Sequence, residues 1–456
     1  MIDFKQFAKH SKPGPRYTSY PTAPEFHEGF TLEAYKRHIA ASNTSGRALS
    51  LYFHIPFCRS ACYFCGCNVV YTSREENKER YLDYLEQEMA LLAAEIDTRR
   101  FVAQIHFGGG TPTFLSAAQL KRLITAIHKY FPNSSQETEF GCEIDPRFFT
   151  AEQMAVMQKG GVNRISFGVQ DFDPQVQEAV HRIQSRELTA QAVQIARDHG
   201  VGSINIDLIY GLPFQSAERF AYTLKETLAL DPDRIALFNY AHVPWLKKTM
   251  RKIDETTLPT PEEKLLIMQN AIETFEGAGM VMIGMDHFAK PTDELALALK
   301  NGTLHRNFQG YTTLRGTDLF GLGLTSIGEG ADFYAQNFRD MGPYEAAIDA
   351  GHLPLMRGFS LDQEDRLRKQ VIMQLMSNFT LDMAAFDREY NLTFEEHFAD
   401  ALKALEPYEQ EGLVEIRDRK ILISDTGRLL VRNLVMGFDA YLQKAPEERR
   451  RFSKTI

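Results

Sequence analysis

The stretch HIPFCRSACYFCGCN, residues 54–68, holds four of the 5 cysteines in a chain of 456 residues. Three of them, Cys58, Cys62 and Cys65, are spaced C-x3-C-x2-C, and Cys67 follows two residues after the third. They come directly after an apolar run that predicts a β-strand. Thiolates on a single loop at the end of a strand can reach one metal centre, so we expect this loop to hold a metal ion or an iron–sulfur cluster.

Three kinds of site are compatible with these cysteines. Zinc prefers four closed ligands, and Cys67 could in principle be the fourth, but zinc sites usually pair two short knuckles that are separated in the sequence. An iron–sulfur cluster is normally held by four cysteines, so three would leave one iron open for a substrate or cofactor. Buried structural thiols are the third possibility, although unrelated cysteines would rarely adopt this spacing. The pattern favours a cluster on Cys58, Cys62 and Cys65.

The composition is typical of a soluble globular protein that has room for one large domain and a smaller one. A net charge of -9 argues against a protein that tracks nucleic-acid phosphates, although it permits a local basic pocket. We find neither a secretory signal nor an apolar run long enough to predict a membrane span. The 5 cysteines, an odd number and mostly clustered, do not make a disulfide framework, which indicates a reducing cytoplasm.

Outward from the cysteine loop, short β-branched or aromatic runs alternate with longer amphipathic segments. The candidate strands are residues 48–55, 103–107, 138–144, 164–170, 202–210 and 234–240. The segments that predict helices between them are residues 78–96, 116–131, 189–200 and 216–230. Such alternation predicts an α/β fold with parallel strands and right-handed crossovers. The pattern alone does not separate an incomplete (β/α)6 barrel from an open doubly wound sheet.

The ends of these strands carry the polar residues. In both folds, chemistry takes place where parallel strands end. The segments that follow the first five strands are the cysteine loop, GGGTPT (108–113), EIDPR (143–147), QDF (170–172) and YGLPFQ (210–215). We therefore expect these segments to converge on one rim and to form an active site.

The chain divides by pattern into three regions: 1–45, 46–358 and 359–456. The first is rich in Pro, Gly, Ser and Thr and predicts an extended arm. The second contains the six strand–helix units. The third predicts a small, mostly helical domain, with helices at residues 361–379 and 394–413, a hairpin at 414–424 and a capped final helix at 425–444.

The three-cysteine motif resembles that of the radical S-adenosylmethionine enzymes, and the chain as a whole is similar to one of their families, the oxygen-independent coproporphyrinogen III oxidases of haem biosynthesis. The matching stretches are PRYTSYPTA (15–23), the cysteine loop, FGGGTPT, EIDPR, SFGVQDF, NIDLIYGLP, FNYAHVP, GMDHFA, HRNFQGYTT and TGRLLVRN (426–433). The resemblance implies a radical SAM partial barrel, one [4Fe–4S] cluster on Cys58, Cys62 and Cys65, and S-adenosylmethionine on the open iron. It also implies the oxygen-independent decarboxylation of two propionates of coproporphyrinogen III to vinyl groups, through a 5′-deoxyadenosyl radical, to give protoporphyrinogen IX.

The resemblance implies two molecules of S-adenosylmethionine. The residues that match the first site are Tyr52, Gly109, Glu143 and Ile327, and those that match the second are Phe64, Gly110, Thr111, Gln170, Arg182, Asp207 and Ala241. Taken alone, the glycines could form a tight turn and the charged residues could be ordinary surface ions. Their places at strand ends favour functional roles. We predict that Cys67 is not an iron ligand, because a fourth thiolate would occupy the open iron, and that Arg182 serves the second cofactor and not the cluster.

The segment GPRYTSYPT, residues 14–22, lies within the predicted arm. A disordered tail is one interpretation. However, Arg16, Tyr17 and Tyr20 can hydrogen-bond a propionate and cover a planar ring. Our hypothesis is a lid that closes over the rim while the radical exists, and that can be removed with residues 1–22 without loss of the fold.

Two alternatives share this scaffold: a radical S-adenosylmethionine methyltransferase that opens haem anaerobically, and a haem chaperone. Such relatives typically lack the RYTSYPT arm and the fourth cysteine of CGC, so the presence of both favours the oxidase. We expect coproporphyrinogen III and a reduced electron donor protein as partners, no nucleic acid, and a monomer. The sequence does not indicate which Arg and Lys bind the propionates, although MIGMDHF (282–288) and HRNFQGY (305–311) contain candidates.

Overall fold

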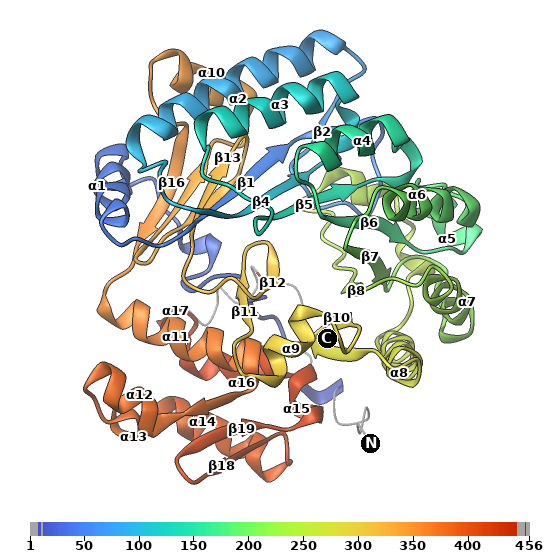
Figure 1. The fold of residues 1–456 in the computed structure, drawn as a ribbon. Coiled ribbons are helices and arrows are strands. Elements are labelled where there is room, and N and C mark those ends of the chain that lie inside the picture. The colour runs from blue at the N-terminus through green and yellow to red at the C-terminus, as the bar shows by residue number, and fades with distance from the viewer. Residues whose placement is uncertain (1–7, 11, 445–451, 453–456) are drawn as a thin grey trace. The chain divides into compact units, whose positions relative to one another are not determined.

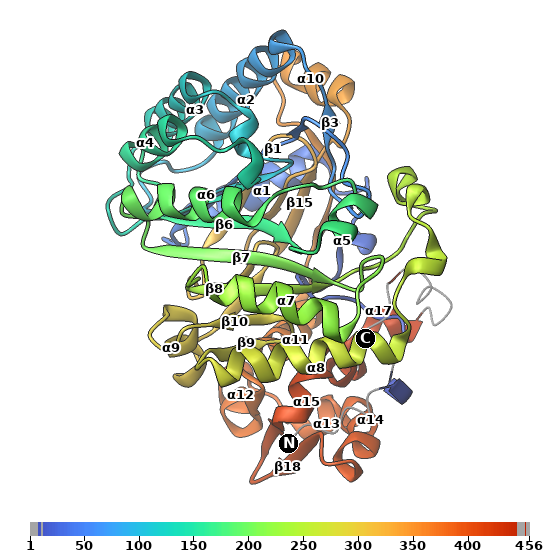
Figure 2. The same ribbon diagram turned by 90° about the vertical axis from the view of Figure 1, so that its right-hand side faces the viewer.

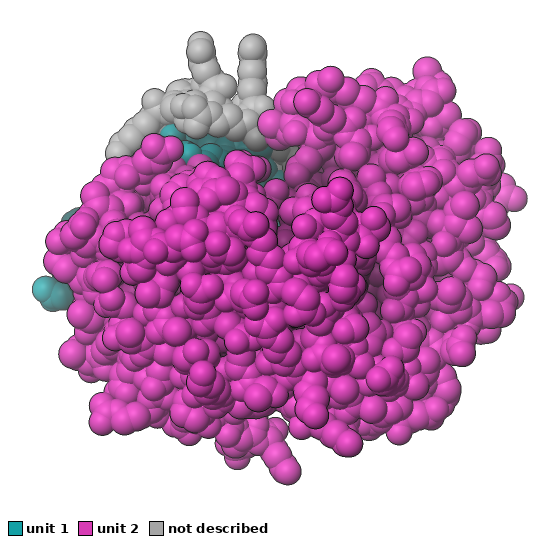
Figure 3. Space-filling view, turned by 90° about the horizontal axis from the view of Figure 1, so that it is seen from above, with its two compact units in different colours: residues 1–25, 260–315, 361–456 teal, residues 26–259, 316–360 magenta. Residues whose placement is uncertain are grey.

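The computed structural model describes residues 8–10, 12–444 and 452 of the chain. These residues form two compact units, which Figure 3 distinguishes by colour. We call them the sheet unit and the helical unit. The sheet unit comprises residues 26–259 and 316–360, and the helical unit comprises the described parts of residues 1–25, 260–315 and 361–456.

The two units are not divided at residues 45 and 358, where the sequence pattern predicts domain boundaries. Residues 260–315, which the sequence pattern places in the barrel region, group with the C-terminal segment, and the predicted arm divides after Glu25. A linear pattern cannot reveal this grouping, because it depends on contacts between segments that are far apart in the chain.

The sheet unit is built on six parallel strands (Figures 1 and 2). In spatial order they are β1 (Leu49–Ile55), β4 (Val102–Gly109), β5 (Glu139–Ile144), β6 (Arg164–Gln170), β7 (Ser203–Tyr210) and β8 (Arg234–Asn239). Every neighbouring pair is parallel, which confirms the six predicted strands and their direction. In β1 all but one of the 7 residues are buried, as expected of a strand that is covered on both faces.

Helices connect these strands and confirm the alternating α/β prediction. They are α2 (Glu75–Glu95), α3 (Ala117–Tyr130), α4 (Ala151–Lys159), α5 (Pro174–Ala179), α6 (Arg186–Asp198) and α7 (Ala217–Leu228). Ser116 and Thr150 begin α3 and α4 with capping boxes, in which each side chain accepts a backbone N–H three residues later. Figures 1 and 2 show α2, α3 and α4 side by side along the parallel strands.

Four further strands extend the sheet beyond β1. They are β13 (Asp318–Leu322), β14 (Ile327–Glu329), β15 (Phe333–Asn337) and β16 (Leu355–Ser360), with α10 (Met341–Asp349) between the last two. β13 is parallel to β1, whereas β14, β15 and β16 are antiparallel to their neighbours. These strands were not predicted from the sequence, because they are short and lack the regular helix spacing of the first six.

Part of the predicted extended arm is a helix. α1 (Leu32–Asn43) begins after Thr31, whose side chain accepts a hydrogen bond from the backbone N–H of Ala34. Tyr35 and Ile39, which are four residues apart, bury one face of this helix. The prediction of extended chain is therefore wrong for this segment, since an apolar pair at helical spacing outweighs its polar composition.

The helical unit contains two hairpins, a small sheet and several helices. Its helices are α8 (Pro261–Gly277), α9 (Glu294–Lys300), α11 (Gln363–Asn378), α12 (Met383–Tyr390), α13 (Phe394–His397), α14 (Ala399–Gln410), α15 (Asp425–Leu429), α16 (Val431–Val435) and α17 (Ala440–Lys444). Its strands are β9 (Val281–Gly284), β10 (His287–Ala289), β11 (His305–Asn307), β12 (Gly310–Thr312), β17 (Thr380–Asp382), β18 (Val414–Arg417) and β19 (Lys420–Ile423). Among the helices that the structure describes, none has the length and apolar character of a membrane span.

The C-terminal predictions are confirmed in part. α11 and the β18–β19 hairpin lie where the sequence predicts them, and β17 adds a third strand. The predicted single final helix is wrong, because a 3-10 turn at Met436–Phe438 separates α16 from α17. Asp439 then starts α17 by accepting hydrogen bonds from the backbone N–H groups of Tyr441 and Leu442.

The arm contributes to the core of the helical unit. Tyr17 and Tyr20 are fully buried among apolar residues of α11, α14 and α16. The Tyr17 hydroxyl donates a 2.9 Å hydrogen bond to Asp439, and the backbone N–H of Ala440 donates one of 3.2 Å to the Tyr20 hydroxyl. These tyrosines are core residues, so the hypothesis of a separate lid that can be removed without loss of the fold is wrong for this segment.

Candidate active site

A cavity of about 260 Å³ opens at the carboxyl ends of the parallel strands of the sheet unit. The predicted cluster ligands Cys58, Cys62 and Cys65 line it. The predicted cofactor-binding residues that line the same cavity are Phe64, Gly109, Gly110, Thr111, Glu143, Gln170, Arg182 and Asp207. The cysteine loop, GGGTPT, EIDPR and QDF thus bring most of the predicted site residues together, whereas YGLPFQ (210–215) contributes no residue to the lining.

The backbone of the cysteine loop is fixed by neighbouring strands. The short strands β2 (Phe57–Cys58) and β3 (Val70–Tyr71) pair in parallel across the loop. The glycine turn after β4 joins them, because Thr111 donates its backbone N–H to the carbonyl of Phe57 at 3.0 Å. A Cβ atom on Gly110 would lie 2.5 Å from the carbonyl oxygen of Phe57 and 3.0 Å from Cys58 Sγ, so only glycine permits this contact.

The three thiols are close enough to influence one another. Burial and the neighbouring thiols of Cys65 and Cys62 raise the pKa of Cys58 to about 12. Hydrogen bonds from Cys67 lower the pKa of Cys65 to about 6. Among the described residues, no three His, Cys, Asp or Glu side chains converge as the ligands of a single metal ion do. Three thiols around one cavity, not around one point, favour a cluster over the zinc alternative.

Cys67 differs from the other three cysteines of the loop. It is exposed, whereas Cys62 is buried and Cys58 and Cys65 are half-buried. The backbone N–H of Cys67 donates to Cys65 Sγ at 3.4 Å, which is the kind of contact that stabilises a ligand thiolate. Its carbonyl accepts a 2.8 Å hydrogen bond from Lys247. The exclusion of Cys67 as an iron ligand stays a prediction.

Glu143 provides a negative charge beside the glycine turn. Its carboxylate accepts a 3.3 Å hydrogen bond from the backbone N–H of Gly109 and a 3.4 Å contact from His106 Nε2. Burial raises the pKa of Glu143, but the hydrogen bonds and charge of these neighbours outweigh it and hold the pKa below its usual value. Tyr52 stacks on His106 behind this carboxylate. An ionised carboxylate in this position can bind an ammonium group.

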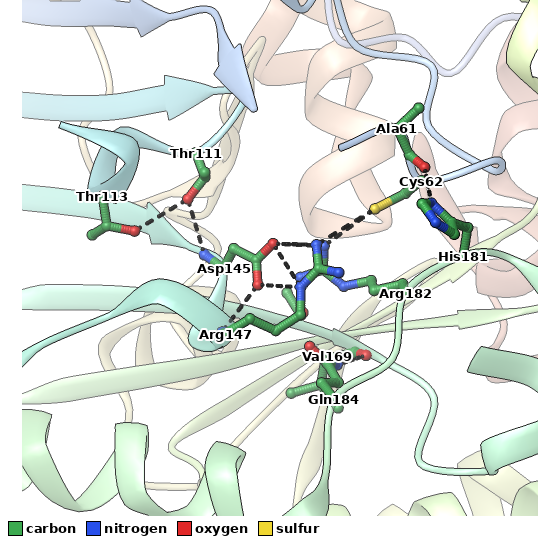
Figure 4. Close-up of polar contacts among 11 residues, drawn as sticks. Ala61, Cys62, Thr111, Thr113, Asp145, Arg147, Val169, His181, Arg182 and Gln184 are labelled. Carbon is green, nitrogen blue, oxygen red and sulfur yellow. Dashed lines mark hydrogen bonds and ion pairs between the residues drawn. The ribbon is translucent and has the colours of Figure 1, made fainter. Parts of the chain in front are cut away.

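Figure 4 shows two arginines that converge on Asp145 and Cys62. Arg147 binds Asp145 at 2.6 Å, and Arg182 binds the same carboxylate at 3.1 Å. The two guanidinium groups also lie 3.8 Å and 3.5 Å from Cys62 Sγ. Burial raises the pKa of Asp145, but the two arginines outweigh it and hold the pKa below its usual value. The arrangement places positive charge directly beside one of the three thiols.

The contacts of Arg182 bear on one prediction. Its Nη2 donates a 2.5 Å hydrogen bond to the carbonyl of Gly168, while its Nη1 contacts both Asp145 and Cys62. Arg182 thus contacts Cys62, a predicted cluster ligand, and the expectation that it has no part at the cluster stays a prediction. Its role towards a second cofactor stays a prediction.

The remaining predicted residues take different places. Asp207 in β7 accepts hydrogen bonds from Ser166 and Asn205 at 2.9 Å and 2.7 Å, on the cavity side of the sheet. Ile327 lies outside the cavity lining in β14, where its backbone packs against Gly321 beside β1. Ala241 is half-buried in the loop after β8 and is likewise outside the lining.

Sequence reasoning did not assign several residues that line the cavity. They are Arg59, Ser60, Val69, Tyr71, Ile144, Asp145, Arg147, Phe148, Ser166, Gly168 and Phe238, besides Cys67. Asp145 and Arg147 belong to EIDPR at the end of β5, so their position at a strand end could have identified them as candidate site residues. Ser166 and Phe238 lie within strands β6 and β8, where nothing in the sequence separates them from other strand residues.

Comparison with known proteins shows the family of this chain. Residues 52–227 match the family model of the Radical SAM superfamily, and residues 361–430 match that of the HemN C-terminal domain. An oxygen-independent coproporphyrinogen III oxidase of Helicobacter pylori (strain J99) is 55% identical over 100% of this chain and 99% of its own length. That of Escherichia coli (strain K12) is 44% identical over 100% of this chain and 98% of its own length. A solved structure described as coproporphyrinogen III oxidase from Escherichia coli, a radical SAM enzyme, has a TM-score of 0.92 and 44% identity, and covers 97% of this chain and 100% of that chain.

Proposed function

This chain belongs to the oxygen-independent coproporphyrinogen III oxidases, a family of radical SAM enzymes, and we propose that it converts two propionates of coproporphyrinogen III to vinyl groups. Each propionate loses one β-hydrogen, CO2 and one further electron, and the product is protoporphyrinogen IX. The observation that carries the proposal is the meeting of three thiols, a glycine turn and an ionised carboxylate in one cavity.

The chain's own residues fit a [4Fe–4S] cluster. Cys58, Cys62 and Cys65 would hold it, and when it is bound together with S-adenosylmethionine it supplies the radical that removes the β-hydrogen. Gly110 leaves room beside Cys58. Arg147 and Arg182 stabilise negative charge on Cys62, and the backbone N–H of Cys67 does so on Cys65.

We propose two S-adenosylmethionine sites in the sheet unit. In the first, Glu143 would bind the ammonium group and Gly109 would allow close approach of the backbone, beside Tyr52 and Ile327. The residues proposed for the second are Phe64, Gly110, Thr111, Gln170, Arg182, Asp207 and Ala241. Among the proposed residues, Tyr52, Ile327 and Ala241 have the weakest support, because they lie outside the cavity lining. Equilibrium binding of radiolabelled S-adenosylmethionine to the cluster-loaded protein should give two molecules per chain, and a value of one would remove the second site.

We propose that the enzyme works in a reducing compartment, the cytoplasm, because its site requires free thiols. It would take electrons from a reduced donor protein, bind no nucleic acid and act as a monomer. Sedimentation of the cluster-loaded protein tests the oligomeric state directly.

An anaerobic assay tests the reaction. The cluster-loaded protein is incubated with coproporphyrinogen III, S-adenosylmethionine and a reductant, and the porphyrins are oxidised and separated. We expect protoporphyrin, with two CO2 released for each product molecule. Cys58→Ser should give none, whereas Cys142→Ser should remain active, because Cys142 is buried in β5 outside the cavity.

The two alternatives give different results in the same assay. A haem chaperone would bind haem stoichiometrically and form no vinyl product. A haem-opening methyltransferase would consume haem and transfer a methyl group. Either result without protoporphyrin would overturn the proposed function.

A further inference from the structure

An exposed basic segment lies beside the cysteine loop in the sheet unit. Residues 245–252, WLKKTMRK, follow β8 and contain four lysines and arginines and no acidic residue. Trp245 and Leu246 are each 68% exposed, and Lys248 and Arg251 are exposed as well. We call residues 245–252 the basic segment.

Two contacts hold the basic segment against the cysteine loop. Lys247 donates a 2.8 Å hydrogen bond to the carbonyl of Cys67, whose own backbone N–H donates to Cys65 Sγ. The ammonium group of Lys252 lies over the ring of Tyr63, 4.8 Å from the centroid, and Tyr63 directly follows a second predicted cluster ligand. The segment thus reaches the loop next to two of the three predicted ligands.

The inner side of the basic segment is packed, so its outer side has a fixed position. Met250 and the following Ile253 are buried in an apolar cluster on which Tyr63 and Phe64 of the cysteine loop pack. Two backbone N–H groups of the segment donate to the carbonyl of Val243 at 2.9 Å and 3.1 Å and close a turn. Two adjacent large apolar side chains on the outside of an ordered turn gain nothing from burial, and such exposed patches mark interaction sites.

The positive charge of the basic segment stands out from the rest of the chain. Lys247, Arg251 and Lys252 contact uncharged groups, namely two backbone carbonyls and an aromatic ring. The next acidic residues along the chain, Asp254 and Glu255, accept hydrogen bonds from neighbouring side chains instead. The whole chain has a net charge of -9, which repels an acidic protein, so a local basic segment directs such a partner to this place.

We propose that the basic segment is the docking surface for a small acidic protein that carries one electron to the cluster. The inference rests on the proposed function, because that reaction takes an electron from outside for each S-adenosylmethionine that is cleaved. The carrier is oxidised by one electron and the cluster is reduced by one, and no bond forms or breaks in this step.

Two properties of the basic segment suit such a carrier. Residues 245–252 lie outside the lining of the cavity that would hold the cofactors, so a carrier bound here does not compete with them. Complexes of electron carriers have small interfaces, and charge sets how fast they form. A short basic segment with an exposed aromatic side chain matches both requirements.

The test measures reduction of the cluster and not turnover. A purified acidic flavodoxin, reduced beforehand, is mixed anaerobically with the cluster-loaded protein, and the reduced cluster is quantified by rapid freezing and electron paramagnetic resonance. The variant is Trp245→Ala with Lys248→Glu, since Lys247 and Lys252 contact the cysteine loop and are left unchanged. We expect reduction by flavodoxin to be at least about tenfold slower at low salt. Photoreduced deazaflavin, a small neutral reductant, should reduce the variant and the wild type at equal rates.

Matched variants separate docking from folding and from charge in general. Tyr222→Ala with Lys225→Glu changes an exposed aromatic residue and an exposed lysine at the same spacing on α7. This control should react with flavodoxin as the wild type does. Lys248→Gln alone provides a second test should the double variant fail to fold. It should slow the reaction by a smaller factor, and its difference from the wild type should shrink as salt is added.

Three results would overturn the inference. The first is an equal rate of reduction by flavodoxin in the wild type and in the variants of the basic segment, or a wild-type rate that salt does not change. The second is a loss of S-adenosylmethionine or coproporphyrin III binding in these variants, measured by equilibrium dialysis, because the segment would then serve a ligand. The third is a wild-type dimer that Trp245→Ala dissociates, because the segment would then bind a second copy of the chain.

Failure of the proposed function gives a different result. The wild type would then be reduced by deazaflavin and make no protoporphyrin, whatever its rate with flavodoxin. Because cluster reduction is measured without the porphyrinogen, the two failures are distinguished in the same set of variants.

Discussion

The cysteine loop, residues 54–68, and the arm, residues 14–22, are both short stretches with little regular secondary structure, yet their side chains have opposite environments. The backbone of the loop is fixed by β2, β3 and the glycine turn, while its thiols line a cavity. The arm instead buries Tyr17 and Tyr20 in the core of the helical unit. The loop is held in place so that its side chains remain available, whereas the arm uses its side chains to hold the unit together.

This contrast predicts that the two regions fail differently. A substitution of a loop thiol should abolish chemistry and spare the fold, since the thiols line a cavity. A change in the arm should affect the fold first, since burial of a large side chain contributes roughly 3–5 kcal/mol to stability. Activity and stability measured on the same variants therefore distinguish the roles of the two regions.

Deletion of residues 1–22 should have the largest effect. It removes Tyr17 and Tyr20 from the core and takes the carbonyls of Gly14 and Pro15 from Arg432. The combined loss is about the size of the whole stability of a typical domain, so we expect insoluble protein or a melting temperature lower by more than about 10 °C. Circular dichroism and gel filtration measure this effect.

A shorter deletion provides the control for that experiment. Removal of residues 1–7 leaves every arm contact described above in place, so its melting temperature is the reference for the loss of residues 8–22. A folded, thermally stable protein that lacks residues 1–22 would restore the hypothesis that the arm is a separate lid.

Serine substitutions in the cysteine loop should have the next largest effect. Cys58→Ser, Cys62→Ser and Cys65→Ser should each lose the cluster and all turnover, while Cys67→Ser should keep most of its iron. We expect melting temperatures of the apo proteins within a few degrees of the wild type, because serine is nearly isosteric with cysteine. Iron content, visible absorbance and circular dichroism measure the two effects separately. Equal iron loss in all four variants would show that Cys67 is also a ligand.

Two substitutions beside the loop should shift the reduction potential of the cluster by a smaller amount, and in opposite directions. Asp145→Asn removes a negative charge next to Cys62 and leaves Arg147 and Arg182 uncompensated, so the reduction potential of the cluster should rise. Arg147→Gln removes a positive charge at the same sulfur, so the potential should fall. Each shift should be on the order of tens of millivolts, which electron paramagnetic resonance at controlled potential resolves. Shifts of the same sign would contradict an electrostatic role for this group.

The sequence predicted the six parallel strands and the rim because both depend on local patterns. Alternating apolar runs and helices set the order of the strands, and the cysteine, glycine and acidic segments then had to meet where the strands end. The strands β13 to β16 lacked such a pattern. Helix α1 was not predicted, because its apolar pair at helical spacing, Tyr35 and Ile39, lies in a segment of mostly polar composition.

The partners of individual side chains were beyond the reach of the sequence. EIDPR marked the end of a strand, but nothing in it indicated that Asp145 would hold both Arg147 and Arg182 against Cys62. The burial of Tyr17 depends on Asp439, more than four hundred residues later in the chain. Such contacts depend on how distant segments pack. They decide whether a given side chain has a binding role or a structural role.

Tyr17→Phe should lower the stability far less than the deletion of residues 1–22, and with a distinctive pH dependence. Burial raises the pKa of Asp439, while the hydrogen bond from Tyr17 lowers it in part. A carboxyl group with a raised pKa in the folded state contributes stability that is complete below its unfolded pKa and is lost as the pH rises through its folded pKa. Loss of the Tyr17 hydroxyl raises that folded pKa further, so the variant should lose more stability than the wild type between acidic and neutral pH.

We expect the cost of Tyr17→Phe to be about 1.5–3 kcal/mol at neutral pH, where the hydroxyl binds a charged carboxylate, and smaller at acidic pH, where both groups are neutral. Urea unfolding of the wild type and the variant at several pH values measures the difference. Asp439→Asn is the control, because in that background Tyr17→Phe should have a small cost that does not change with pH. A cost that is equal at all pH values in the native background would mean that the stabilising effect of the Tyr17 hydroxyl does not depend on the charge of Asp439.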